Sequence, residues 1–348
     1  MKAANTMQVR QHNKTVIRQA MLCLRQATRP QLAQKTGLSQ VTVSAVLAEL
    51  MEKGEVESCG SVPSEGGRPS ACYRYRGERH NAGVLYTYQM EGRTLVQLEV
   101  FDLFGDRVDR ASQFLGDLRP ESFDALLDAA FQETPDIRTL ALGVPGQVRE
   151  KRFSSATTAP WRGDSLSRRW KGRYHVPVLL ENDINAAVLG YVQGLPGEVA
   201  GLTAGIYFPG RFGPGMGLAL GRSPWPGRQG FVGEFHYLYG LDQWNGMDHG
   251  NPAAVEETAA RYLRAVCVMA GPERVVLYGD VFRPGSEETI RQKVEKTFYN
   301  AYGLQLEVRR DMGPDYSAGM KALALRQLKH TPFWNSLGGR ITCLPRCS

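Results

Sequence analysis

The 348-residue sequence has no apolar run of the 18 or so residues that a membrane-spanning helix needs. Its first residues, MKAANTMQVRQHNK, lack the apolar stretch of a secretory signal, so we expect a cytoplasmic protein with no membrane contact. Cysteine is scarce: six residues are scattered without the spacing of a disulfide framework, which favours a reducing compartment. Charged residues at 22% and hydrophobic residues at 42% exclude a fibrous or wholly disordered chain.

Positive charge is concentrated at one end of the chain. Residues 1–79 hold 12 Lys and Arg against 6 Asp and Glu, a net charge of +6, whereas the whole chain carries +7. A small basic segment on a nearly neutral remainder indicates an acidic partner such as DNA. A basic surface that serves only solubility would show the same balance.

Three helical patterns follow one another in the basic segment. The first has an apolar stripe over residues 17–24. Thr28 is a natural N-cap for a short second helix that Gly37 ends, and Ser39 can cap the third. The turn between the second and third helices has three residues, which is the spacing of a helix-turn-helix.

Short or amide side chains lie at the start of the third helix, where they can enter a major groove and bond base edges. We take five residues as candidates for DNA contacts: Ser39, Gln40, Thr42, Val43 and Ser44. An ordinary helical hairpin with polar residues facing solvent is the alternative.

Two short strand patterns, 55–58 and 73–75, enclose a loop rich in Gly, Pro and Ser and predict a β-wing. Arg68, between Gly67 and Pro69, suits a narrow, electronegative minor groove, although an arginine in a surface turn is the alternative. The helices and the wing together predict a winged helix-turn-helix domain over residues 1–79.

The remainder alternates between strand and helix patterns, which is typical of an α/β fold. Strands are expected at Leu95–Phe101, Leu140–Val144, Val176–Leu180, Leu202–Phe208, Val275–Tyr278 and Leu304–Val308. Helices are expected at Phe123–Phe131, Ile184–Val192, Ala253–Met269 and Glu287–Tyr302. We expect two α/β lobes with a cleft between them.

Three segments of this body could carry chemistry. Gly143–Val148 is a strand that runs into a tight glycine turn, and Gly213–Gly217 is a glycine-rich stretch that permits close approach of a ligand. Glu181–Ala187 places polar groups at the end of a buried strand, where ligands usually bind in α/β folds. Asp183 could accept a proton or bind hydroxyls beside Asn182, or the two could simply cap a helix.

Together these segments resemble the ROK family of repressors, open reading frames and kinases, over roughly residues 13–328. Glu181–Ala187 matches the family's Glu-Asn-Asp-x-Asn-Ala-Ala motif, Gly143–Val148 its Gly-Val-Pro-Gly-Pro-Val turn, and Gly233-Glu234 the start of its Gly-Glu-x-Gly-His segment. The basic segment is similar to the head of the family's sugar-responsive repressors. The resemblance implies a two-lobed actin/hexokinase-like sugar-kinase fold that binds sugar through Asn182, Asp183 and Glu234, with the displaced His236 as a further candidate.

The sequence departs from the kinases of this family at the nucleotide loops and at the zinc motif. In the first phosphate loop, Met90 replaces the acidic residue and Arg93 replaces a glycine. In the second phosphate loop, Pro214 replaces a residue whose N–H could contact phosphate. No cysteine lies between Cys72 and Cys267, so the zinc motif is absent. We therefore expect no enzyme activity, no cofactor and no metal.

The sequence thus predicts a transcriptional repressor. Residues 1–79 bind a double-stranded DNA operator, residues 80–330 sense a sugar or sugar phosphate and form a homodimer, and residues 331–348 are a tail. Two alternatives are a sugar kinase with a DNA-binding head and a DNA-binding dimer that ignores ligands.

Overall fold

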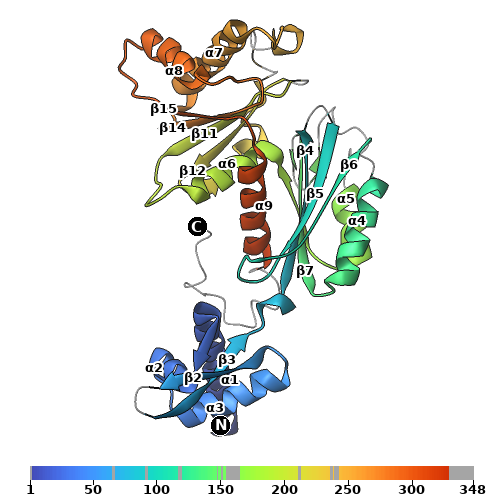
Figure 1. Ribbon diagram of the computed structural model, residues 1–348, viewed down its shortest axis with the longest axis vertical. Helices are drawn as coiled ribbons and strands as arrows, with labels where there is room; N and C mark the ends of the chain where they lie inside the picture. The colour runs from blue at the N-terminus through green and yellow to red at the C-terminus, as the bar shows by residue number, and fades with distance from the viewer. Residues whose placement is uncertain are drawn as a thin grey trace.

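The computed structural model describes residues 2–64, 67–90, 93–116, 120–146, 148–149, 152–153, 165–210, 213–235, 238 and 243–328. Figure 1 shows three parts that follow one another along the long axis: the head (residues 2–79), lobe 1 and lobe 2. Lobe 1 is built around the sheet that contains β4, and lobe 2 around the sheet that contains β11. No helix within these ranges is long and apolar enough to cross a membrane.

The head contains three helices and a three-stranded antiparallel sheet of order β1-β3-β2. Its elements are α1 Lys2–Leu24, β1 Gln26–Thr28, α2 Arg29–Thr36, α3 Gln40–Glu52, β2 Val56–Ser64, β3 Gly67–Tyr75 and the 3-10 turn η1 Gly77–Arg79. The expected cap of the second helix is confirmed, because Thr28 and Gln31 form a reciprocal capping box. The expected stop is confirmed as well: Gly37 has a φ of 72°, in the left-handed region that favours glycine.

Lobe 1 holds a five-stranded mixed sheet of order β10-β7-β4-β5-β6 with helices α4 and α5 beside it (Figure 1). Its elements are β4 Asn81–Met90, β5 Arg93–Phe101, β6 Arg107–Leu115, α4 Pro120–Glu133, β7 Ile137–Val144, α5 Ser165–Tyr174 and β10 Val178–Asn182. A two-stranded ribbon, β8 Val148–Arg149 and β9 Arg152–Phe153, follows β7. β7 and β10 are parallel, so their carboxyl ends reach the same edge of the sheet.

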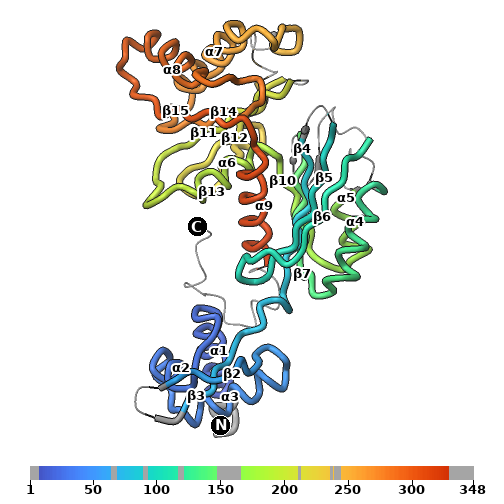
Figure 2. The backbone as a smooth tube through the Cα atoms, in the orientation of Figure 1, coloured from blue at the N-terminus to red at the C-terminus, as the bar shows by residue number. Residues whose placement is uncertain are grey.

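Lobe 2 repeats this plan with a sheet of order β13-β12-β11-β14-β15. Its elements are β11 Leu202–Tyr207, β12 Gly215–Leu220, β13 Ser223–Pro224, η3 Arg228–Gly230, η5 Gln243–Gly246, α7 Pro252–Ala270, β14 Arg274–Tyr278, α8 Ser286–Thr297 and β15 Gln305–Arg309. Figure 2 follows the chain from the head through lobe 1 to lobe 2.

Two helices, α6 Asp183–Gly194 and α9 Gly313–Leu328, lie between the lobes (Figure 1). They cross at two glycines. A Cβ atom at Gly190 would lie 1.8 Å from the backbone oxygen of Asp315, and one at Gly319 would lie 1.8 Å from that of Ala186. A side chain at either position would collide with the opposite backbone unless the helices moved apart, so the two backbones are in direct contact.

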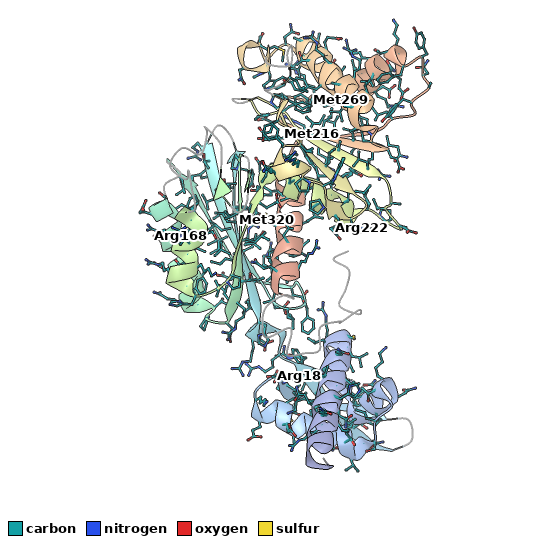
Figure 3. All side chains as sticks on the ribbon, turned by 180° about the vertical axis from the view of Figure 1, so that it is seen from behind. Arg18, Arg168, Met216, Arg222, Met269 and Met320 are labelled. Carbon is teal, nitrogen blue, oxygen red and sulfur yellow. The ribbon has the colours of Figure 1, made fainter. Side chains whose placement is uncertain are left out.

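Each of these helices belongs to a different lobe. Gly205 of lobe 2 packs against Val188 of α6, whereas Gly143 of lobe 1 packs against Met320 of α9. Figure 3, which labels Met216 and Met320, shows Met216 within lobe 2 and Met320 on α9 beside the lobe 1 sheet. The α6–α9 crossing is thus the structural connection between the lobes.

The sequence-based expectations for the body hold for every element named, with shifted ends. The helix expected over 287–302 is α8, which ends at Thr297 because Tyr299 and Asn300 adopt left-handed φ angles of 54° and 57°. The elements outside those expectations are strands β4, β6, β8, β9, β12 and β13 and helices α5 and α9. Among the described cysteines, Cys59, Cys72 and Cys267 are free, whereas Cys23 is disulfide-bonded, which its scattered spacing does not indicate.

Candidate functional site

The start of α3 is fixed by its own cap. The Ser39 hydroxyl accepts a hydrogen bond from the Thr42 N–H at 3.2 Å, and the two hydroxyl oxygens lie 2.9 Å apart. Gly37 turns the chain between α2 and α3, and Val46 and Leu47 bury the inner face of α3 in the head. The opposite face of α3 is consequently held in one orientation toward solvent.

That outward face carries small or uncharged side chains. Gln40, Ala45 and Ala48 are exposed, and Val41 leaves 81% of its surface open to water. Thr42 and Ser44 are half-buried beside them. Small side chains let a helix backbone approach a groove closely, and an apolar side chain can contact the methyl group of thymine.

The burial of two valines differs from the sequence-based expectation. The expectation that Val43 contacts DNA is wrong, because Val43 is 0% exposed in the core of the head. Val41, which is exposed, is not among the expected DNA contacts. Its signal in the sequence is an apolar residue that lies outside the buried stripe of Val43, Val46 and Leu47.

The predicted wing corresponds to β2 and β3, which pair antiparallel. Val56 lies opposite Tyr75 at one end of the hairpin, and Ser64 lies opposite Gly67 at the other. The strands are longer than the sequence pattern indicates. Arg68 lies in β3 one residue from the tip of this hairpin, and its side chain is outside the described part of the structure.

A second site is built around the start of α6. Asn182 ends β10 and caps α6, because its side-chain oxygen accepts the Asn185 N–H at 3.0 Å. Its amide nitrogen donates to the backbone oxygen of Gly146 at 3.0 Å and to Asp183 Oδ1 at 2.9 Å. The Gly143–Gly146 turn and the Glu181–Asn185 segment, two of the predicted motifs, therefore meet at one point.

Asp183 is the buried acid of this site. The residue is only 8% exposed. Besides the Asn182 amide, its Oδ1 accepts the Ile184 N–H at 2.9 Å. Burial raises the pKa of Asp183 to about 7, and repulsion from nearby Glu234 acts in the same direction. Burial also raises the pKa of Glu181. The site therefore holds a carboxyl group that can gain or lose a proton near neutral pH.

Strand β12 joins the third motif to this site. A Cβ atom at Gly217 would lie 2.9 Å from Asn185 Oδ1, and one at Gly233 would lie 1.8 Å from the backbone oxygen of Met216. The Met216 N–H also donates to the Gly233 oxygen at 3.3 Å. Glu234 follows Gly233 directly and lies near enough to Asp183 for its charge to raise the pKa of that carboxyl group beyond the effect of burial. His236 lies outside the described residues.

The segments that resemble the nucleotide loops fall at strand ends. Met90 and Arg93 form the last pair of the β4–β5 hairpin, and the guanidinium of Arg93 lies 3.8 Å from the centre of the Phe114 ring. Pro214 is buried just before β12. The guanidinium of Arg93 is thus engaged by an aromatic ring of β6.

Comparison with known proteins gives this fold a context. A family model described as "ROK family" matches residues 95–246. Among curated proteins, the xylose repressor of Caldicellulosiruptor bescii is 26% identical over 239 residues (65% of this chain), and that of Bacillus subtilis is 23% identical over 235 residues (66%). The matches span 58% and 61% of those relatives' lengths.

Solved structures show the same fold. The crystal structure of a ROK hexokinase from Thermus thermophilus covers 72% of this chain at 18% identity, with a TM-score of 0.55. A ROK family transcriptional regulator, a homolog of the E. coli MLC protein, covers 93% at 15% identity, with a TM-score of 0.50. The body therefore has the mixed α/β, actin/hexokinase-like fold of these proteins.

Proposed function

We propose, from the premise that the chain carries a ROK family domain, that it is a sugar-responsive DNA-binding repressor. The head, residues 1–79, is a winged helix-turn-helix that binds an operator. Residues 80–330 sense the sugar and pair two chains, and the tail 331–348 lies outside both. We place the protein in the cytoplasm, where its operator would be.

The observation that carries this proposal is the exposed face of α3. Val41 is 81% exposed beside Gln40 at the start of a helix whose inner face is fully packed. An apolar side chain left open at this position of a helix-turn-helix suits the major groove. Ser39, Gln40, Thr42 and Ser44 remain the proposed polar contacts, and Arg68 the proposed minor-groove contact. A homodimer would match a two-fold operator.

The sugar would bind at the start of α6. The carboxylates of Asp183 and Glu234 accept hydrogen bonds from hydroxyl groups, and charge-assisted bonds of this kind are stronger than neutral ones. The Asn182 side chain already hydrogen-bonds the Gly146 oxygen, the Asn185 N–H and Asp183 Oδ1. It would therefore orient Asp183 as well as contact the sugar. Binding would favour one arrangement of the lobes and so change how two heads meet an operator.

One observation favours the kinase alternative. A pKa of about 7 is suited to a general base, and Asp183 has it. Phosphoryl transfer, however, depends on charge stabilisation and positioning of the phosphates. By resemblance, Met90 replaces the acidic residue of the kinases' first phosphate loop and Arg93 replaces a glycine of the same loop. Pro214 replaces a residue of the second loop whose N–H could contact phosphate. We therefore propose that the site binds sugar without phosphorylating it.

A sugar panel tests the sensing role. D-xylose, included because the relatives are named xylose repressors, and D-glucose are added to the purified chain, and unfolding is followed by calorimetry. A sugar present at 100 times its Kd stabilises by about 2.7 kcal/mol, which raises the Tm. ATP turnover is measured in parallel and is expected to be absent. A panel without any Tm increase contradicts sensing, and sugar-dependent ATP turnover establishes the kinase instead.

Val41→Glu tests the DNA-binding face. The added carboxylate would face the phosphates, and like charges across an interface cost several kcal/mol, so operator affinity should fall about 100-fold. The free energy of unfolding should stay within about 0.5 kcal/mol, because the position is exposed. Affinity is measured by fluorescence anisotropy on an operator selected from a random pool.

The matched control for this test is Val268→Glu on α7, where the valine is 73% exposed. It adds the same charge to the body and should leave affinity within about twofold. Equal losses in both variants would mean that net charge alone controls binding, and unchanged affinity in Val41→Glu would remove α3 from the interface.

A further inference from the structure

The turn between β5 and β6, Asp102–Asp106, is built as a rigid unit. Asp102 Oδ1 accepts the N–H groups of Phe104 and Asp106, both at 2.9 Å. The Asp102 N–H in turn donates to the Asp106 oxygen at 2.9 Å, and Gly105 takes a φ of 81° that permits the tight turn. Three backbone N–H groups of this turn, those of Asp102, Phe104 and Asp106, are thereby satisfied within the turn itself.

This turn belongs to lobe 1, but its outer side contacts the head. The Phe104 ring fills the space beside Gly77, where a Cβ atom would lie 2.4 Å from Phe104 Cε2. It meets the ring of Tyr75 edge to face, with centroids 6.4 Å apart. The guanidinium of Arg25, the residue after α1, lies 4.8 Å from the Phe104 centroid and bonds Asp106 Oδ2 at 2.6 Å.

These contacts make the cores of head and body continuous. One apolar cluster includes buried head residues such as Ile17 and Tyr75, Leu103 of the turn, and Leu325 of α9. The Leu103 N–H also approaches the Gly77 oxygen at 3.4 Å. The head is consequently seated on lobe 1 through the β5–β6 turn, and the chain connection at residues 76–80 runs past the same turn.

The inner side of the turn contacts α9. A Cβ atom at Gly105 would lie 3.2 Å from Leu325 Cδ1, and the Lys321 ammonium lies 5.5 Å from the centre of the Phe101 ring. The opposite end of α9 lies beside the proposed sugar site. The Tyr316 ring packs against Tyr86 at 4.9 Å, and a Cβ atom at Gly143 would lie 2.4 Å from the Tyr316 hydroxyl. Burial raises the pKa of Tyr316, and the charge of Asp183 adds to this shift. A helix of this length spans about 24 Å, so one rigid element contacts both places.

We propose that the Asp102–Asp106 turn is the segment that positions the head, and that α9 transmits displacement from the sugar site to it. This proposal rests on the proposed function for its second part. Phe104, Asp106 and Arg25 are positioning residues: none of them belongs to the sugar site or to the DNA-binding face. Replacing these residues should leave sugar binding and DNA binding intact, but sugar binding should no longer change the affinity for DNA.

The variant that tests this is Phe104→Ala combined with Asp106→Arg. An exposed ion pair contributes at most about 1 kcal/mol, so loss of the Arg25–Asp106 bond alone would leave the ring in place. Removing the ring, which packs against Tyr75 of the shared cluster, and placing a cation opposite Arg25 opens the contact between the head and lobe 1. The matched control is Glu288→Arg, which breaks a comparably exposed ion pair with Arg291 on α8.

Hydrogen exchange measures the seating of the head without any ligand. In the double variant, amide exchange at residues 75–79 and 102–106 should rise at least tenfold, while α3 and the start of α6 keep their wild-type rates. Unchanged exchange at both segments would overturn the positioning role. Arg25→Glu added to Asp106→Arg, with Phe104 intact, restores an ion pair of reversed polarity and should return exchange to within about twofold of wild type.

The second measurement is operator affinity with and without saturating D-xylose. We expect the sugar to lower wild-type affinity at least fivefold, in the usual range of allosteric coupling, and to change that of the double variant less than twofold. Affinity without sugar should stay within about threefold. A double variant that keeps the full sugar effect contradicts transmission through the turn. A wild type that ignores sugar contradicts the proposed function, and hydrogen exchange then decides the positioning role alone.

Discussion

Gly319→Ala is expected to lower the free energy of unfolding by about 3 kcal/mol, the upper end of what overpacking costs. The added methyl group would lie 1.8 Å from the Ala186 oxygen, and the nearest atoms are backbone rather than flexible side chain. α6 and α9 must then separate by more than an ångström along the contact that joins the lobes. Urea denaturation followed by circular dichroism measures the change.

The sign of this effect separates packing from helix propensity. Alanine in place of glycine inside an exposed helix stabilises it by about 1 kcal/mol. Gly172 of α5 is exposed, and a Cβ atom there would have nothing within 4 Å, so Gly172→Ala should be neutral or stabilising. If Gly319→Ala were stabilising too, the α6–α9 crossing would be looser than its geometry indicates.

Asp183→Asn is expected to stabilise the protein and to abolish the proposed response to sugar. The folded pKa of about 7 lies above the ordinary value of 3.8, so the folded state binds more protons than the unfolded state between these two values. Stability therefore falls as pH rises through this window, and the cost is complete above pH 7. Asparagine keeps the two bonds that Oδ1 accepts and removes the charge.

The size of the effect follows from the shift. At about 1.4 kcal/mol per pKa unit, Asp183→Asn should raise the free energy of unfolding at pH 8 by up to about 4 kcal/mol, and by little at pH 4. Denaturation at both pH values measures it, together with D-xylose titration. Glu288→Gln, which removes a half-exposed charge from α8, should show no such gain. A pH-independent difference would mean that Asp183 does not titrate in this window.

Much of the fold was predictable because its signals are local. In the head, helix boundaries are marked by the capping residues Thr28, Gly37 and Ser39. The polar residues at the end of β10 likewise indicate where α6 begins. Strand β6 gave no such signal: it is an edge strand with mostly exposed residues, so its alternation is weak. Helix α9 contains Gly319, a poor helix former that only the distant contact with Ala186 explains.

The candidate sites divide in the same way. Asn182 and Asp183 are neighbours in sequence, so a motif could indicate them, and Glu234 joined them only through a resemblance. Its approach depends on Gly233 packing against Met216, a contact between segments that no periodicity encodes. Val43 was misplaced because a residue near the start of α3 can face either way, and only burial separates it from Val41.

The position of α9 at the end of the described chain bears on how the protein is made. The head contains its own buried residues, such as Leu32 and Leu47, and leaves the ribosome before α9. At about 5–20 residues per second, the stretch from the head to α9 takes on the order of 10–50 seconds to synthesise. Until then α6 has no partner at Gly190, and the lobes lack the α6–α9 contact. We expect each new chain to pass through an interval in which the head is folded while α6 still lacks its contact with α9.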